Sequence, residues 1–85
     1  MTKKPHPKKA EVEDIKTFLH NVAWLRKQHG LSKKVIATLL NISVKDVKQI
    51  ERGIIPPDMS VAVVFQIHKH FGVRPEDQFQ WWLGD

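Results

Sequence analysis

Apolar residues recur every three or four positions through most of this chain, which is the spacing of one buried helix face. In the first third the repeating positions are Ile15, Phe18, Leu19, Val22 and Leu25. Acidic residues between Glu11 and Asp14 suit the positive end of a helix dipole, and Gly30 suits a left-handed cap at the other end. The pattern therefore predicts a helix that begins near residues 11–14 and ends at His29.

Residues 31–53 predict two short helices joined by a tight turn. Ser32 and Ser43 are the expected N-caps, and Asp46 follows Ser43 at the spacing of a capping box. Asn41 tolerates the left-handed backbone that a sharp turn needs, and Gly53 is expected to end the second helix. The apolar positions of the pair are Leu31, Val35, Ile36, Ala37, Leu39, Leu40, Ile42, Val47 and Ile50.

The last third predicts a loop and two more helices. Two prolines within residues 54–58 block helix continuation. A fourth helix over residues 60–70 has as its expected core Val61, Val64, Phe65, Ile67 and Phe71. Pro75 begins a fifth helix that is expected to reach about Leu83. No strand pattern is evident, so the prediction is an all-α, compact five-helix domain over residues 11–85, preceded by a disordered basic arm over residues 1–10.

Composition narrows the function. Eighty-five residues form one small domain, with little room for an enzyme pocket, and no catalytic arrangement is evident. The absence of cysteine excludes disulfides and thiolate metal sites and suits a cytoplasmic protein. No apolar run is long enough for a membrane span. The five histidines lack metal-ligand spacing, so no metal and no cofactor are predicted.

Positive charge is concentrated in the middle of the chain. Residues 26–52 carry seven Lys or Arg against two acids, whereas residues 53–85 carry two against four. Clustered cations raise the local concentration of a polyanion and speed its capture. The uneven distribution favours nucleic acid as a partner, with an ordinary solvated basic surface as the alternative. Lysines in the arm either follow the duplex or form an inert tail.

The outer face of the second short helix is long and polar. At about 100° per residue, Lys45, Lys48, Gln49 and Arg52 lie opposite the apolar positions. Lysine pairs with guanine, glutamine with adenine, and an apolar residue such as Val44 with a thymine methyl. Lys48 and Arg52, with Lys33 and Lys34 at the preceding helix start, suit phosphates. Asp46 is either a cap partner or an acceptor for cytosine N4.

Residues 22–57 resemble the phage repressor and Cro (XRE) helix-turn-helix family. The matching residues are Val22, Leu25, Arg26, Gly30 to Ser32, Ile36, Ala37, Leu40 to Ser43, Val47, Ile50 to Gly53 and Pro57. The resemblance implies a five-helix lambda-repressor-like fold with the third helix in the major groove, and a structural Arg26–Glu51 pair. Asn41 replaces the usual turn glycine, Lys33 stands where Gln is common, and the stretch after Pro57 is about two residues longer.

The complete set of expected DNA contacts is Arg26, Ser32, Lys33, Lys34, Ser43, Val44, Lys45, Asp46, Lys48, Gln49 and Arg52. The predicted function is a sequence-specific regulator that binds double-stranded DNA, with residues 44–52 as recognition helix, as a homodimer. The alternative is an antitoxin or anti-repressor that binds a partner protein, such as a toxin, through Trp81, Trp82 and Leu83. One of the two adjacent tryptophans is expected in the core and the other exposed as an anchor.

Overall fold

Five helices make up the described part of the chain, which in the computed structural model comprises residues 11–80, 82 and 83. They are α1 (Glu11–Gln28), α2 (Lys33–Leu40), α3 (Val44–Glu51), α4 (Ala62–Phe71) and α5 (Pro75–Gln80). No strand occurs among these residues. The all-α, five-helix prediction is confirmed, whereas the arm over residues 1–10 and Trp81 lie outside the described residues.

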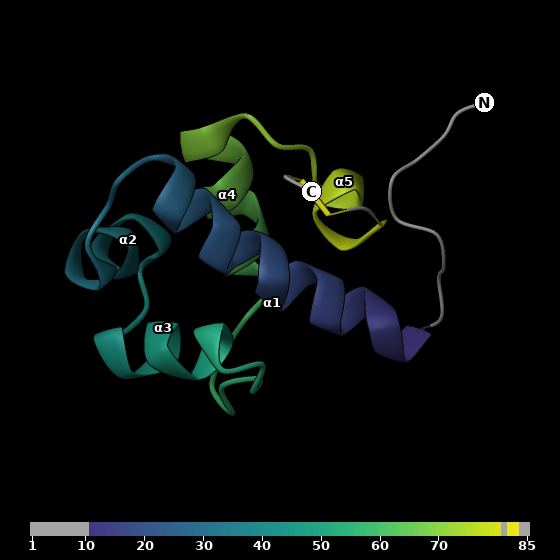
Figure 1. Cartoon of the computed structure of the whole chain (residues 1–85), viewed down its shortest axis with the longest axis horizontal. Helices are drawn as coiled ribbons and strands as arrows, with labels where there is room; N and C mark the ends of the chain where they lie inside the picture. Colours follow the sequence, from purple (N-terminus) through teal and green to yellow (C-terminus); the bar gives the residue numbers. More distant parts are fainter. Residues whose placement is uncertain (1–10, 81, 84–85) are drawn as a thin grey trace.

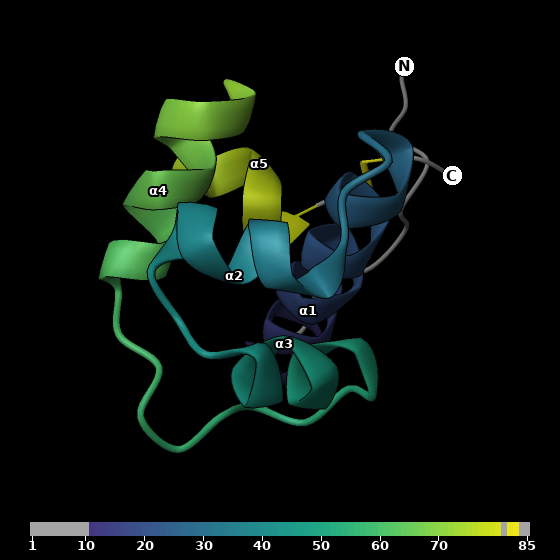
Figure 2. The same cartoon turned by 90° about the vertical axis from the view of Figure 1, so that its left-hand side faces the viewer.

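The long helix α1 is the centre of the arrangement. It packs against α3 on one side and against α5 on another, while α2 packs against both α3 and α4. Figure 1 shows α3 along one edge of the molecule, and the turned view in Figure 2 shows α2 between α3 and the α4–α5 pair. As a result, α3 is supported from behind by α1 and α2, and none of the other described helices lies on its outer side.

One hydrophobic core joins the helices. Its buried members are Phe18, Leu19, Val22, Leu25, Ile36, Ala37, Leu40, Val47, Ile50, Val63 and Ile67. The predicted apolar positions of α1, α2 and α3 supply most of this list. Ile15 and Val35 are exceptions, since 37% and 45% of these residues are exposed. Their assignment to the buried face was wrong, because both lie at the edge of their helix stripe.

The buried face of α4 differs from the prediction. Val61 and Phe65 were expected in the core, but they are 71% and 60% exposed. Ile67 is buried as expected, Val64 and Phe71 pack partly buried against the core, and Val63, which was not predicted, is buried as well. The helix starts at Ala62, two residues later than expected, because the loop after Gly53 continues further. Two neighbouring stripes of α4 are apolar at helical spacing, so the spacing alone does not say which one faces the core.

Buried polar contacts join α1, α5 and the C-terminal end; we call Asn21, Gln78 and their partners the polar latch. The Asn21 Nδ2 donates to the backbone O of Gln78 at 2.9 Å, and its Oδ1 accepts from the Leu83 N at 2.9 Å. The Gln78 Nε2 donates to the backbone oxygens of Val64 and Val73, both at 3.0 Å. The described part of α5 ends at Gln80, and Leu83, which was expected near the end of this helix, is bonded to α1.

Candidate nucleic-acid interface

The turn between α2 and α3 is fixed by local hydrogen bonds. The Ser32 Oγ accepts from the Val35 N at 3.1 Å, and the Ser43 Oγ accepts from the Asp46 N at 3.0 Å. Asn41 has a φ of 61°, the left-handed conformation expected of it. Both serine caps and the asparagine turn are therefore confirmed. Each cap satisfies a backbone N–H that the first helical turn leaves without a partner.

The outer side of α3 carries three exposed cations. Lys45, Lys48 and Arg52 are exposed, whereas Val47 and Ile50 on the inner side are 0% and 1% exposed. None of the three cations forms an ion pair within the described part of the chain. Their charge is consequently available to a partner, and the buried valine and isoleucine fix which side of α3 faces outward.

Gln49 departs from the expected free surface. It is half-buried, and its Oε1 is buried without a hydrogen-bond partner among the described residues. A buried amide oxygen without a donor loses its hydration and gains nothing in exchange. The side chain thus has an acceptor that remains unused in this conformation. Val44, at the helix start, is half-buried against the core.

Asp46 is 7% exposed, far less than its sequence position at the edge of the outer face suggested. Its backbone N–H is bonded by Ser43, but its carboxylate accepts no hydrogen bond within the described residues. Only the serine half of the predicted capping box is therefore formed. Burial of Asp46 favours a place in the scaffold of α3 over a contact with bases.

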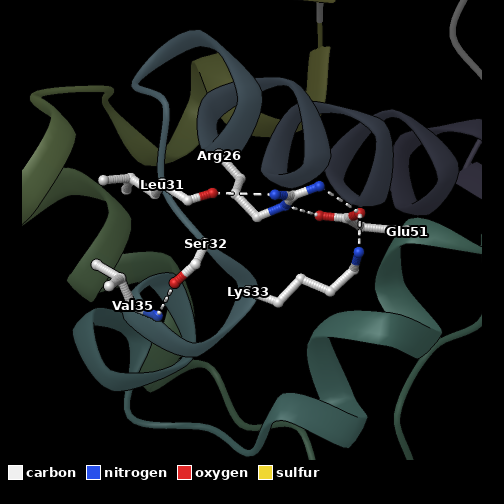
Figure 3. A network of polar contacts seen from close by, with 6 residues as sticks. All are labelled: Arg26, Leu31, Ser32, Lys33, Val35 and Glu51. Atoms are coloured by element: carbon white, nitrogen blue, oxygen red, sulfur yellow. Dashed lines mark hydrogen bonds and ion pairs between the residues drawn. The ribbon is translucent and has the colours of Figure 1, made fainter.

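An ion-pair network ties α1 to the two short helices, as Figure 3 shows. The Arg26 Nε and Nη2 both donate to the Glu51 carboxylate, the Nη2 at 3.1 Å from Oε1. The Arg26 Nη1 donates to the backbone O of Leu31 at 2.9 Å. The side chains of Arg26 and Glu51 are 15% and 11% exposed. Bidentate geometry of this kind fixes orientation, so the pair sets the position of α3 against α1.

The hydrogen bonds that Arg26 donates to Glu51 raise the pKa of Arg26 above its ordinary value, whereas burial acts in the opposite direction. A second cation reaches the same carboxylate, since the Lys33 Nζ lies 3.9 Å from the Glu51 Oε1. The sequence analysis missed this contact, because residues 18 positions apart on different helices give no local signal. Lys33 is thus held at the start of α2 with its side chain 41% exposed.

Ser32 and Lys34 complete the surface next to Lys33. Both are exposed, and they adjoin the first turn of α2, where free backbone N–H groups favour an anion. The start of α2 and the outer side of α3 belong to one helix pair with a single turn between them (Figure 2). Two cationic surfaces, one at each helix, therefore belong to one rigid unit.

A family model described as helix-turn-helix matches residues 22–78, about two thirds of the chain. The chain belongs to this family. This helix-turn-helix family is the one of the XRE, Cro and C1 proteins, so the resemblance expected from the sequence is confirmed. The protein is therefore a DNA-binding transcription regulator of the XRE kind. Comparison with curated proteins and with solved structures finds no match.

The remaining expectations concern the ends of the chain and metals. Trp82 is 42% exposed and stacks on His20 with ring centroids 4.2 Å apart. Leu83 packs partly buried against the core, and Trp81 lies outside the described residues. Trp24 also packs against the core, although it lies off the main apolar stripe of α1.

Within residues 11–80, 82 and 83, no group of three potential ligands gathers for a metal ion, and no helix has the length and apolarity to cross a membrane.

Proposed function

We propose that this helix-turn-helix regulator binds a specific duplex DNA sequence as a homodimer, with residues 44–52 in the major groove. The observation that carries the proposal is the outer side of α3, where Lys45, Lys48 and Arg52 are exposed and unpaired within the described chain. A helix fits the major groove of B-DNA when its outer side is free of neighbouring chain. The position of α3 along one edge of the molecule, with the loop that follows it beside its C-terminal end, supports this assignment (Figure 1).

Base recognition is assigned to the first two turns of α3. Lys45 donates to guanine O6 and N7, and Val44 contacts a thymine methyl group. The buried Oε1 of Gln49 lacks a donor, and the N6 amino group of adenine supplies one when the side chain turns outward. Asp46 is left out of this set because the residue is only 7% exposed.

Phosphate contacts are assigned to the cations around that centre. Lys48 and Arg52 lie further along α3, while Lys33 and Lys34 lie at the start of α2, where Ser32 and free N–H groups add donors. Such contacts fix the register of the protein on the duplex without reading its sequence. Arg26 is committed to Glu51 and Leu31, so its role is to hold the two helices in position.

Titration of labelled genomic fragments at several salt concentrations tests the proposal. We expect selective binding to a subset of fragments and a linear fall of log affinity with log salt, because bound phosphates release counterions. Equal affinity for all fragments would contradict the proposed contacts with bases. No binding at low salt would overturn the function itself.

The homodimer rests on the exposed apolar surface. Trp82 is 42% exposed at the C-terminal end, and an exposed aromatic side chain is a common anchor of protein interfaces. Sedimentation equilibrium of the wild type and of Trp82→Ala tests this assignment: the dimer is expected to weaken in the variant. A wild type that stays monomeric, even on DNA, would contradict it.

The same exposed tryptophan favours the second candidate function, which is binding of a different protein, such as a toxin, by an antitoxin or anti-repressor. The two functions are distinguished by co-purification at native expression. A stoichiometric second chain that is lost in Trp82→Ala would support the second candidate, and a single chain that self-associates would support the first.

A further inference from the structure

A groove of about 500 Å³ lies between α1 and the C-terminal end of α3, on residues that the proposed DNA contacts leave mostly unused. Leu19, Ala23 and Ile50 form its apolar base, and Trp24 and His20 supply aromatic rings. A volume of this size is typical of small-molecule sites, which pair an apolar lining with a few polar groups.

The rim of the groove is cationic. Lys16 and Lys27 from α1 and Arg52 at the end of α3 line it, and all three are exposed. Among the described residues of the lining, Glu51 is the one acid, and its charge is already compensated by Arg26 and Lys33. Within the described part of the chain, Lys16, Lys27 and Arg52 form no ion pair with a carboxylate.

The α1 side of the groove follows from helical spacing. Lys16, His20, Ala23 and Lys27 recur at intervals of three or four residues, so they share one side of the helix. The ring of His20 is braced from outside by Trp82, which stacks on it at 4.2 Å. The wall is thus fixed by packing.

We propose that this groove binds a small aromatic anion, namely a flat ring that carries a carboxylate or a phosphate. The ring packs on the apolar base against Trp24, and the anionic group pairs with Lys16, Lys27 and Arg52. A DNA duplex presents its sugar–phosphate surface outward and has no flat ring to place on this apolar base. A small ligand satisfies both the apolar and the cationic parts of the site.

Occupation of the groove is coupled to DNA binding through Arg52, and this part rests on the proposed function. An anion that pairs with Arg52 withdraws one cation from the phosphate contacts and adds negative charge beside the duplex. The ligand therefore weakens DNA binding and lowers the salt slope by about one phosphate contact.

Calorimetric titration of the DNA-free protein tests the site without relying on DNA. Indole-3-acetate and adenosine 5′-monophosphate are the two probes, and the tighter one identifies carboxylate or phosphate as the anionic group. Indole alone and inorganic phosphate alone supply one feature each, and we expect both to bind at least about tenfold more weakly than the better probe. Equal binding of either control, or no binding of both probes, would overturn the proposal.

Variants locate the site. Lys16→Gln combined with Lys27→Gln removes two rim charges and should weaken the better probe by about tenfold, whereas Lys69→Gln, an exposed lysine on α4, should leave its affinity unchanged. Ala23→Leu fills the base and should abolish binding. Circular dichroism checks that Ala23→Leu folds. If this variant does not fold, the double lysine variant alone decides whether the ligand binds in the groove. Wild-type affinity in the double variant would contradict the site.

DNA titration with and without the better probe then tests the coupling. We expect lower DNA affinity in its presence and no such effect in the double lysine variant. If the ligand binds but the DNA affinity does not change, the coupling to DNA binding is contradicted and the ligand site in the groove still stands. Failure of the protein to bind DNA at all would instead contradict the proposed function while the calorimetric result stands.

Discussion

The helix pair α2–α3 and the helix pair α4–α5 are built by different means. Serine caps, a left-handed asparagine and exposed lysines shape the first pair, and every one of these features is local in sequence. The second pair is held by buried polar groups, with Gln78 bonded across to Val64 and Val73. The first pair consequently keeps its outer side free for a ligand, while the second holds the scaffold together.

Loss of the polar latch should give the largest effect. Gln78→Ala removes both side-chain hydrogen bonds to the backbone oxygens of Val64 and Val73 and opens a cavity where Gln78 is buried, so the free energy of unfolding should fall by about 3 kcal/mol. Urea denaturation measures the change. Gln80→Ala, exposed on the same helix, is the control and should match the wild type. Sequence preference for DNA should be unchanged in the folded fraction of the variant. A changed preference would show that the α4–α5 pair also affects the DNA contacts of the α2–α3 pair.

The link between α1 and the first pair comes next. Arg26→Met leaves the largely buried Glu51 carboxylate with only the distant Lys33, and we expect a loss of about 2 kcal/mol in the free energy of unfolding. Arg74→Met provides the control, because the Arg74–Asp77 pair is exposed and its loss should not be measurable. Equal effects in the two variants would show that the Arg26–Glu51 pair does not position α3.

A change at Lys45 distinguishes contacts that select the base sequence from contacts that only add affinity for DNA. Lys45→Ala should reduce the preference for the specific site over a base-substituted site by about tenfold, because one bidentate contact to guanine is lost. Competition titration with the two duplexes measures the ratio. Lys69→Ala on α4 should leave the ratio unchanged. If Lys45→Ala kept the wild-type ratio, the assignment of α3 to the major groove would be wrong.

Lys33 should show the smallest effect. Lys33→Ala removes a phosphate contact at the start of α2, so affinity should fall by a similar factor for every sequence and the salt slope should drop by about 1. Affinities at four or more salt concentrations on specific and random duplexes give both quantities. A loss confined to the specific duplex would mean that Lys33 reads bases.

Prediction from sequence succeeded where the determining signals lie close together along the chain. Both serine caps, the Asn41 turn and the buried faces of α1 and α3 follow from residues three or four positions apart. Val61 and Phe65 were placed wrongly because α4 carries two apolar stripes at helical spacing, and the spacing alone does not say which one faces the core. The polar latch joins residues 57 and 62 positions apart, so no local pattern indicates it.

The candidate site was predicted less completely than the fold. Exposure of Lys45, Lys48 and Arg52 follows from the helical pattern around buried Val47 and Ile50. The burial of Gln49 and Asp46 does not follow from the helical pattern, because it depends on side-chain conformation and on chain that packs beside α3. The groove between α1 and α3 was missed as well, because it joins lysines that sequence analysis treats as separate solvated surface.

Methylation interference on a selected binding site tests the central claim most directly. Methylation of guanine N7 adds a group in the major groove and leaves the phosphates and the minor groove unaltered. If α3 lies in that groove with Lys45 at a guanine, methylation there should abolish binding by the wild type and have little effect on Lys45→Ala. Equal binding to methylated and unmethylated site by the wild type would contradict the account.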